Sequence, residues 1–333
     1  MSVDPDLEIA ELPLDDRAGH EAYAALWSAV MPRYPITAAE LERQRPRRPD
    51  DVRLIGRIDW AVAGCAAAIR SDLPGRTYVG NVVLPEYRGR GLGRAQLERL
   101  VAAARSHGSD LLAVGVEEGD EAGERFAARF GLCEVLRELE ISRPVEPNEP
   151  YPTPPDGIVL VELAQRPDLL RGAYSLTCEA LPHMPLHAPL ELPSYERWME
   201  EDAAGPDVLE GGTLVALDGD CVVGFVSLLR RAADPHLAEH GLTSVAASHR
   251  NRGIATALKQ AQIAWASRNG FRELMTSTQD ANVAMRAVND KLGYEPRPAW
   301  IRLEAPLDDV EAALAAETGR SRPSVSRGGE PGP

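Results

Sequence analysis

Two stretches with the same pattern decide the fold: residues 82–93, VVLPEYRGRGLG, and residues 244–255, SVAASHRNRGIA. They lie 162 positions apart (250 − 88 for the first arginine of each), and this offset continues without a gap. It is kept by Gly108 and Gly270, Leu112 and Leu274, Gly131 and Gly293, and Pro144 and Pro306. A constant offset over glycine and proline landmarks indicates an internal duplication. The chain of 333 residues is about twice the typical domain of ~150 residues, which agrees with two copies of one domain.

Local patterns in each copy predict mixed α/β structure. Apolar residues recur at helical spacing from Ile254 to Trp265 and stop at Gly270, a typical helix end. Two apolar segments on either side of Asp218-Gly219 predict a β-hairpin. Thr37 and Glu40 have the spacing of a capping box at a helix start. The predicted order in each copy is β-α-α-β-β-β-α-β-α-β-β.

The duplication also predicts the domain boundaries. We assign residues 1–143 to the first domain and 157–306 to the second. Residues 144–156 are rich in proline and are expected to form a semi-rigid spacer. Residues 307–333 are expected to form a partly disordered tail, because the segment from Ser321 is composed mainly of Ser, Gly, Pro and Arg.

The duplicated segment has the features of a pyrophosphate-binding turn. Both copies fit the pattern Arg-x-x-Gly-x-Gly/Ala, after an apolar strand and at the start of a helix. Free N–H groups and the positive end of the helix dipole bind phosphate there, and small residues let it approach the backbone. It is not a Walker loop, since no Lys-Ser/Thr follows, and the third glycine of the dinucleotide-binding pattern is missing.

On these residues the chain resembles the GNAT superfamily of acyl-CoA-dependent N-acyltransferases over residues 7–143 and 158–305, as a tandem member. The resemblance implies α/β domains, each a bent mixed sheet flanked by helices, with a splayed strand pair that admits the pantetheine arm of CoA. It implies CoA contacts from Ser244, Val245, Arg250, Asn251, Arg252, Gly253, Ile254, Ala255, Thr256 and Asn282 in the second copy. In the first copy the matching residues are Val83, Arg88, Gly89, Arg90, Gly91, Leu92, Gly93 and Arg94.

Differences between the copies suggest that only the second is catalytic. Asp120 stands in the first copy where the second has Asn282, and a carboxylate is a poor neighbour for an anionic cofactor. Many relatives have a tyrosine, thought to protonate the departing thiolate, where this chain has Asn289 and, in the first copy, Ala127. The amide of Asn289 can donate a hydrogen bond to sulfur but has no useful pKa. Asn289 and Tyr294 are therefore the candidate catalytic residues.

No general base is assigned from the sequence. Glu239 and His240 precede the key strand, and Glu179 and His183 lie near the first helix of the second copy, so any of the four could act through water. The second copy also has about ten extra residues around 181–193, a proline-rich loop. The resemblance places the acceptor pocket under this region, although a variable surface loop explains it nearly as well.

Composition excludes several other classes. The net charge of -15, shared as -7 and -8 between residues 1–150 and 151–333, argues against nucleic-acid binding. The four cysteines have no metal-binding spacing, so no metal is expected, and a reduced cytoplasmic protein is indicated. No apolar run is long enough to cross a membrane.

The sequence thus predicts an acetyl-CoA-dependent N-acetyltransferase that transfers an acyl group directly to the primary amine of a small molecule. Two alternatives stay open. One is a non-catalytic, CoA-binding regulatory protein, which the absent tyrosine makes credible. The other is a protein N-acetyltransferase.

Overall fold

The structure is a computed structural model that describes residues 6–13, 15–44, 50–71, 73–183 and 192–320. The first half contains β1 (Leu7–Glu11), α1 (Arg17–Val30), α2 (Ala38–Gln44), β2 (Val52–Ile58), β3 (Ala61–Arg70), β4 (Arg76–Val83), α3 (Leu92–Ser106), β5 (Leu111–Glu117), α4 (Glu121–Arg129) and β6 (Cys133–Pro144). The second half contains β7 (Ile158–Glu162), α5 (Leu170–Ala180), α6 (Tyr195–Trp198), β8 (Leu214–Asp218), β9 (Cys221–Arg230), β10 (Leu237–Val245), α7 (Ile254–Arg268), β11 (Glu273–Gln279), α8 (Val283–Lys291), β12 (Glu295–Pro296), β13 (Trp300–Pro306) and α9 (Leu307–Arg320).

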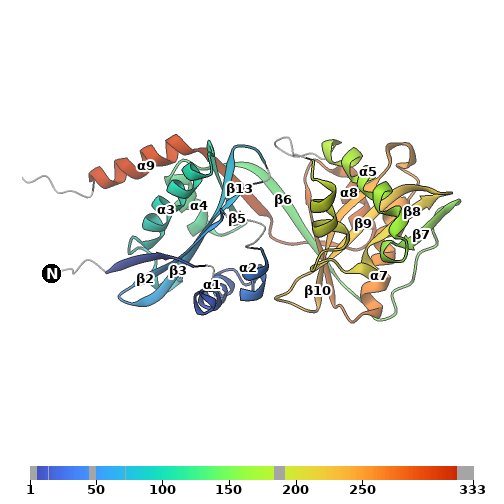
Figure 1. The fold of residues 1–333 in the computed structure, drawn as a ribbon, viewed down its shortest axis with the longest axis horizontal. Helices are drawn as coiled ribbons and strands as arrows, with labels where there is room; N and C mark the ends of the chain where they lie inside the picture. Colours follow the sequence, from blue (N-terminus) through green and yellow to red (C-terminus); the bar gives the residue numbers. More distant parts are fainter. Residues whose placement is uncertain (1–5, 14, 45–49, 72, 184–191, 321–333) are drawn as a thin grey trace, which may run out of the picture.

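The strands form one continuous mixed sheet that runs through both halves. Its order is β1-β2-β3-β4-β5-β13-β6-β11-β10-β9-β8-β7, with β12 paired to β6. The pairs β4·β5 and β10·β11 are parallel, and the other neighbours are antiparallel. Figure 1 shows the two halves side by side along the long axis of the molecule, joined by β6. The predicted mixed α/β architecture is confirmed.

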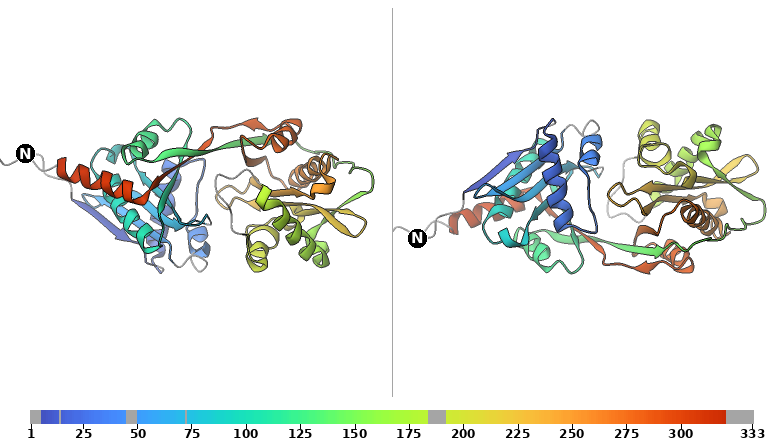
Figure 2. Two further views of the ribbon diagram at one scale, coloured as in Figure 1. Left: turned by 90° about the horizontal axis from the view of Figure 1, so that it is seen from above. Right: turned by 90° about the horizontal axis from the view of Figure 1, so that it is seen from below.

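The duplication appears in the element bounds. Adding 162 to the bounds of α3, β5 and α4 gives those of α7, β11 and α8. Helix α1 packs on one face of the first half's sheet, and α3, α4 and α9 lie on the other, as the views of Figure 2 also show. The predicted capping box is present, since Thr37 Oγ1 accepts from the Glu40 N–H at 3.2 Å and Glu40 Oε2 accepts from the Thr37 N–H at 2.7 Å.

The last strand of each copy is exchanged between the halves. Strand β6 ends the first copy but pairs with β11 of the second, from Glu273 opposite Pro144 to Gln279 opposite Glu138. Strand β13 ends the second copy but pairs with β5 of the first, from Trp300 opposite Glu117 to Pro306 opposite Leu111. The observed arrangement therefore differs from the predicted boundary at residue 306. The sequence pattern marks both segments as strands, but it does not say which sheet edge each one joins.

Two other expectations differ in the same region. Residues 307–320 form helix α9 rather than a tail, while the expectation of disorder for residues 321–333 lies outside the described residues. Pro144 is the last residue of β6, and the Val145 N–H donates to the Arg272 carbonyl at 2.9 Å. The start of the predicted spacer is thus hydrogen-bonded to the second half, and the sheet itself joins the two copies.

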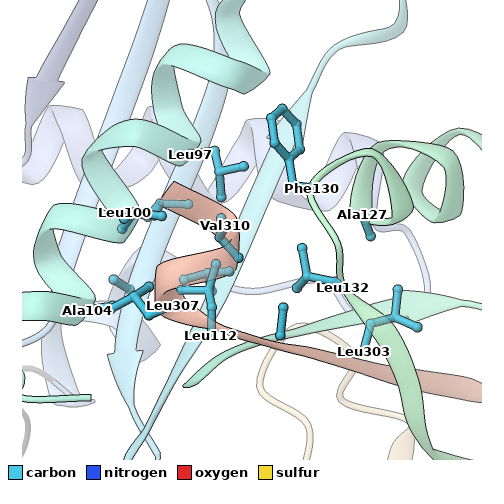
Figure 3. Packing of buried hydrophobic residues seen from close by; sticks show 14 of the residues in the cluster. Leu97, Leu100, Ala104, Leu112, Ala127, Phe130, Leu132, Leu303, Leu307 and Val310 are labelled. Carbon is cyan, nitrogen blue, oxygen red and sulfur yellow. The ribbon is translucent and has the colours of Figure 1, made fainter. Parts of the chain in front are cut away.

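Helix α9 completes the core of the first half. Leu307 and Val310 are fully buried, and they pack with residues of α3, β5 and β13. Figure 3 shows them beside Leu97, Leu100 and Leu112. Ion pairs at the rim hold the helix, since Arg105 of α3 contacts Glu311 at 2.8 Å. The first half therefore depends on the last described residues of the chain for its hydrophobic core.

Candidate functional site

The loop between β10 and α7 has the geometry of an anion-binding helix start. Gly253 is the N-cap of α7 at φ +83, a left-handed conformation that favours glycine. Gly253 has no side chain to cap the helix, so the N–H groups of residues 254–256 lack that acceptor. These N–H groups form the positive end of the helix dipole. Arg250 Nε donates to the Val245 carbonyl at 3.2 Å, which anchors the guanidinium at the strand end.

Beside this loop the sheet opens. Strands β10 and β11 pair only from Leu237 to Glu239 with residues 273–275, and beyond Glu239 strand β10 follows β9 alone. The register is irregular between His240 and Thr243. The opening is part of a cavity of about 1260 Å³. Its second-half walls come from residues 177, 180, 181, 202, 240–245, 249–251, 253–256, 259, 276–279, 282, 284, 285, 287 and 288.

Most second-copy residues predicted to contact the cofactor lie on this cavity. They are Ser244, Val245, Arg250, Asn251, Gly253, Ile254, Ala255, Thr256 and Asn282. Arg252 is not on the wall and lies 3.5 Å from Asp218 in the β8–β9 turn. Asn282 is the N-cap of α8, where its Oδ1 accepts from the Met285 N–H at 3.2 Å. Its amide nitrogen is the group left to face a ligand.

The first copy has the same loop. Gly91 is the N-cap of α3 at φ +90, and Arg88 Nε donates to the Val83 carbonyl at 3.1 Å. Arg90 pairs with Asp59 at 2.6 Å, as Arg252 pairs with Asp218. The backbone and arginine geometry of the cradle is thus preserved in both copies.

Next to that loop, however, the first copy is closed. Strands β4 and β5 pair from Arg76 to Val79, and the cavity beyond them is only about 350 Å³. The Trp27 ring lies against Gly80, 2.8 Å from the position of a Cβ there, and the Trp300 indole of β13 lies directly against Gly115. Neither Val83 nor residues 88–94 line this cavity. The first-copy loop residues therefore do not adjoin an open slot between strands.

A chain of buried hydrogen bonds runs under the second-half cavity. Gln262 Nε2 donates to the Gly212 carbonyl at 2.7 Å, so Gln262 Oε1 must accept from His240 Nδ1, also at 2.7 Å. His240 Nε2 is then the acceptor for the Tyr294 hydroxyl. Burial and the nearby Lys259 lower the pKa of His240, in agreement with a neutral ring. The direction of every hydrogen bond follows from the single carbonyl of Gly212.

The two predicted catalytic residues lie behind the cavity wall. Tyr294 is buried with its hydroxyl bonded to His240, and burial raises the pKa of Tyr294. Asn289 is fully buried, and neither of its side-chain polar atoms has a hydrogen-bond partner. Neither Asn289 nor Tyr294 is among the described residues that line the cavity.

Lys259 reaches the cavity where they do not. It is buried on α7 and lines the cavity together with His240, and its Nζ lies 5.3 Å from the centroid of the Tyr294 ring. Burial lowers the pKa of Lys259 to about 7. Helical spacing concealed this residue within an apolar pattern. The rarity of lysine could have drawn attention to this residue, since Lys259 and Lys291 are the only lysines in the chain.

The duplication shows that this polar cluster belongs to the second copy alone. Subtracting 162 from Lys259, Gln262, Asn289 and Tyr294 gives Leu97, Leu100, Ala127 and Leu132. These four residues are buried in the hydrophobic core of the first half (Figure 3). His240 corresponds to Tyr78. Positions that pack a core in one copy therefore carry hydrogen-bonding and titratable groups in the other.

The first half, together with strand β13 that joins its sheet, supplies a further wall of the cavity. Ile69, Tyr78, Glu138 and Arg302 line it from β3, β4, β6 and β13. Arg302 Nε donates to the Tyr78 hydroxyl oxygen at 2.9 Å, and Arg302 lies 3.6 Å from Glu138. The sequence did not predict this contribution, because it depends on the strand exchange.

Of the carboxylates that could accept a proton from the substrate, some line the cavity and others do not. Asp202, which the sequence reading did not single out, lines the cavity, and burial raises its pKa to about 6. Glu239 pairs with Arg231 at 3.0 Å and is not among the cavity residues described. Glu179 accepts a hydrogen bond from the Ala247 N–H at 3.2 Å. Residues 184–191 of the predicted acceptor loop lie outside the described residues, but Leu181 at its start does line the cavity.

Comparisons with known proteins agree with the fold and its duplication. The mycothiol acetyltransferase of Thermobispora bispora is 27% identical over 293 residues, which cover 86% of this chain and 95% of the relative. That of Catenulispora acidiphila is 28% identical over 224 residues, covering 66% and 69%. Among solved structures, a tandem GNAT protein from the clavulanic acid biosynthesis pathway has a TM-score of 0.73 at 21% identity, covering 91% of this chain and 99% of that one. A GCN5-related N-acetyltransferase from Sphaerobacter thermophilus gives 0.71 at 19%, covering 90% and 96%.

The fold and the site define an N-acetyltransferase with two copies of its domain. The model of the acetyltransferase (GNAT) family matches residues 19–132 and again residues 173–294, and the chain belongs to that family. The tandem GNAT resemblance predicted from the sequence is thereby confirmed. In the parts of the chain that the structure describes, each helix is too short or too polar to cross a membrane.

Proposed function

We propose that the protein transfers the acetyl group of acetyl-CoA to the primary amine of a small molecule, and that the second copy carries the reaction. The observation that supports this most strongly is the cavity of about 1260 Å³ beside the loop of residues 250–256, set against the first copy, where Trp27 and Trp300 occupy the equivalent region. The name of the relatives, mycothiol acetyltransferase, indicates a small-molecule acceptor for them. We extend that class of acceptor, without the particular compound, to this chain.

The residues present fit the cofactor. The uncapped N–H groups of residues 254–256 and the Arg250 guanidinium would hold the pyrophosphate, because both present positive charge at a helix start. A side chain at Gly253 would strain a backbone at φ +83. The pantetheine arm would lie along β10 beyond Glu239, where the strand has no pairing with β11.

Direct transfer requires a base for the amine and a donor for the oxyanion. An alkylamine with a pKa near ~10 is mostly protonated at neutral pH and must lose a proton before it attacks. Asp202 is the carboxylate we assign to this step, acting directly or through water, since its raised pKa lies near the working range. Backbone N–H groups at Ser244 or Val245 would stabilise the oxyanion in the splayed segment.

The acceptor would bind between the halves. Tyr78 and Glu138 of the first half, and Arg302 of β13, which joins the sheet of that half, line the cavity. They offer a ring, a carboxylate and a guanidinium. An acceptor that carries both an amine and further polar groups fits such a wall. This gives the first copy a role in specificity without chemistry of its own.

The experiment measures thiol release from acetyl-CoA with a panel of small amines, for the wild-type protein and the matched variants Arg88→Glu and Arg250→Glu. We expect Arg250→Glu to lose most turnover and Arg88→Glu to keep it. Loss of activity in Arg88→Glu alone would reverse the assignment of the active copy.

The non-catalytic alternative is favoured by one observation, the amide of Asn289 at the position of the family tyrosine. It predicts that CoA protects the protein from unfolding while no amine in the panel gives turnover. Protein N-acetylation is tested by adding peptides with free N-termini or lysines to the same panel.

A further inference from the structure

Lys259 is the group at the cavity wall that remains to be explained once the hydrogen bonds behind it are assigned. We propose that Lys259 is the acid that protonates the sulfur of CoA as it leaves, in the place of the absent tyrosine. This proposal rests on the proposed function, since it needs a thioester to be cleaved in the second copy.

The hydrogen-bond chain removes Tyr294 from that role. Its hydroxyl proton is donated to His240 Nε2, and His240 Nδ1 is already engaged with Gln262. The Tyr294 ring, held in this way, lies beneath the Lys259 amine, with Nζ 5.3 Å from the centroid. An aromatic face stabilises an ammonium group that has been removed from water. The chain therefore positions Lys259 and does not itself deliver a proton.

The other nearby groups cannot supply the proton. Asn289 carries an amide without a useful pKa. His240 lines the cavity, but its Nδ1–H bonds Gln262 and its Nε2 accepts from Tyr294. Arg143 and Glu149, which lie near Tyr294, form an ion pair with each other. Burial lowers the pKa of Lys259, and among the residues described no carboxylate forms an ion pair with its amine.

The comparison between copies supports a functional reason for the lysine. A buried lysine is costly, and the first copy avoids the cost with Leu97 at the same position. The partners that hold the cluster in the second copy are likewise replaced by Leu100 and Leu132. The lysine and the residues that support it thus differ together between the two copies, which is expected if they serve one task.

The step balances without any other reactant. The amine nitrogen bonds to the thioester carbonyl carbon and loses one proton to the base. The C–S bond then breaks, the electron pair goes to sulfur, and Lys259 transfers its proton there to give the free thiol. Neutral Lys259 regains a proton from water before the next turnover.

The acidity of Lys259 suits this transfer. Burial brings its pKa to about 7, below the ~8.5 of an ordinary thiol, so a proton passes from the ammonium to a thiolate favourably. At neutral pH about half of the Lys259 side chains carry the proton. Activity should therefore fall as the pH rises through the pKa of Lys259.

The test compares wild type, Lys259→Leu, Lys259→Arg and, as a matched control, Lys291→Leu, an exposed lysine of α8. Two donors are used with the best amine of the panel: acetyl-CoA and 4-nitrothiophenyl acetate, whose thiol is acidic enough to leave without a proton. The binding of CoA to each variant is measured separately by calorimetry.

We expect Lys259→Leu to lose about 10²–10⁴-fold in kcat with acetyl-CoA, as for the loss of a general acid, and only a few-fold with the aryl thioester. Its CoA affinity should change little, and the basic limb of its kcat–pH profile should disappear. Lys259→Arg should not restore activity, because a guanidinium does not give up its proton. Lys291→Leu should behave as wild type.

Equal losses with both donors, or full activity in Lys259→Arg, would overturn the proposal and indicate packing or charge alone. If the wild-type protein turned over no amine at all, the proposed function would fall first and the role of Lys259 with it. Turnover in wild type with an unchanged pH profile in Lys259→Leu would reject the lysine while leaving the proposed function intact.

Discussion

Replacing Leu307 by alanine should destabilise the first half of the protein, although the residue follows the second copy in the sequence. Leu307 is 0% exposed and packs in the hydrophobic cluster formed with α3, β5 and β13. Removing a buried leucine side chain costs about 2–5 kcal/mol through lost burial and the cavity left behind. For a cooperative unit of 150–250 residues, 3 kcal/mol corresponds to a fall in Tm of about 6–12 °C.

The assay is hydrogen exchange followed by mass spectrometry, together with urea unfolding. We expect Leu307→Ala to raise the rate of amide hydrogen exchange, relative to wild type, more in α3 and β5 than in β8 and β9. The control is Asp309→Ala on the exposed side of α9, which should cost less than about 1 kcal/mol. A loss below 1 kcal/mol for Leu307→Ala, or faster exchange confined to β8 and β9, would refute the exchange of β13 and α9 between the halves.

Three further outcomes are expected. Lys259→Met should raise the free energy of unfolding by up to roughly 5 kcal/mol below pH 7, because the pKa of Lys259 falls from 10.5 to about 7 on folding. This gain should shrink as the pH rises toward 10.5. Chemical denaturation at pH 6 and at pH 10 measures the difference. Asp202→Asn should remove the acidic limb of the kcat profile near pH 6, where the carboxyl of Asp202 titrates, and lower kcat about 10²-fold or more; an unchanged limb would exclude Asp202 as the base. Gly253→Val should weaken acetyl-CoA binding at least tenfold, whereas Gly91→Val in the closed copy should leave it unchanged by calorimetry, since both glycines have positive φ but only the loop of Gly253 adjoins the large cavity.

The repeat carried most of the fold prediction. Glycines at positions 108 and 270 sit just past the ends of α3 and α7 at φ +70 and +79, where a side chain would be strained, so their spacing reported real helix ends. The pairing of β13 could not be predicted in this way. Side-chain alternation identifies a strand and its buried face, but either half offers an edge with the same hydrogen-bonding groups.

The second-copy loop could be singled out from the sequence, because glycine and arginine together at a helix start have few other uses. In the structure most of these loop residues line the large cavity. Lys259 and Gln262 were missed, because both lie within the apolar helical pattern of α7. His240 and Tyr294 were singled out, but the hydrogen bonds that join them to Gln262 link separate elements and could not be predicted. Only alignment of the copies shows that Lys259 and Gln262 replace Leu97 and Leu100.

The exchanged strand has a consequence for synthesis. A ribosome makes β5 about 190 residues before it makes β13, since Leu111 precedes Trp300 by 189 positions. During that interval the outer edge of β5 has no partner from its final sheet, and an open edge invites pairing with other chains. The first half therefore cannot reach its native sheet while only residues 1–150 have emerged. Its maturation waits for the second copy, so the nascent chain needs protection at β5 until translation has nearly ended.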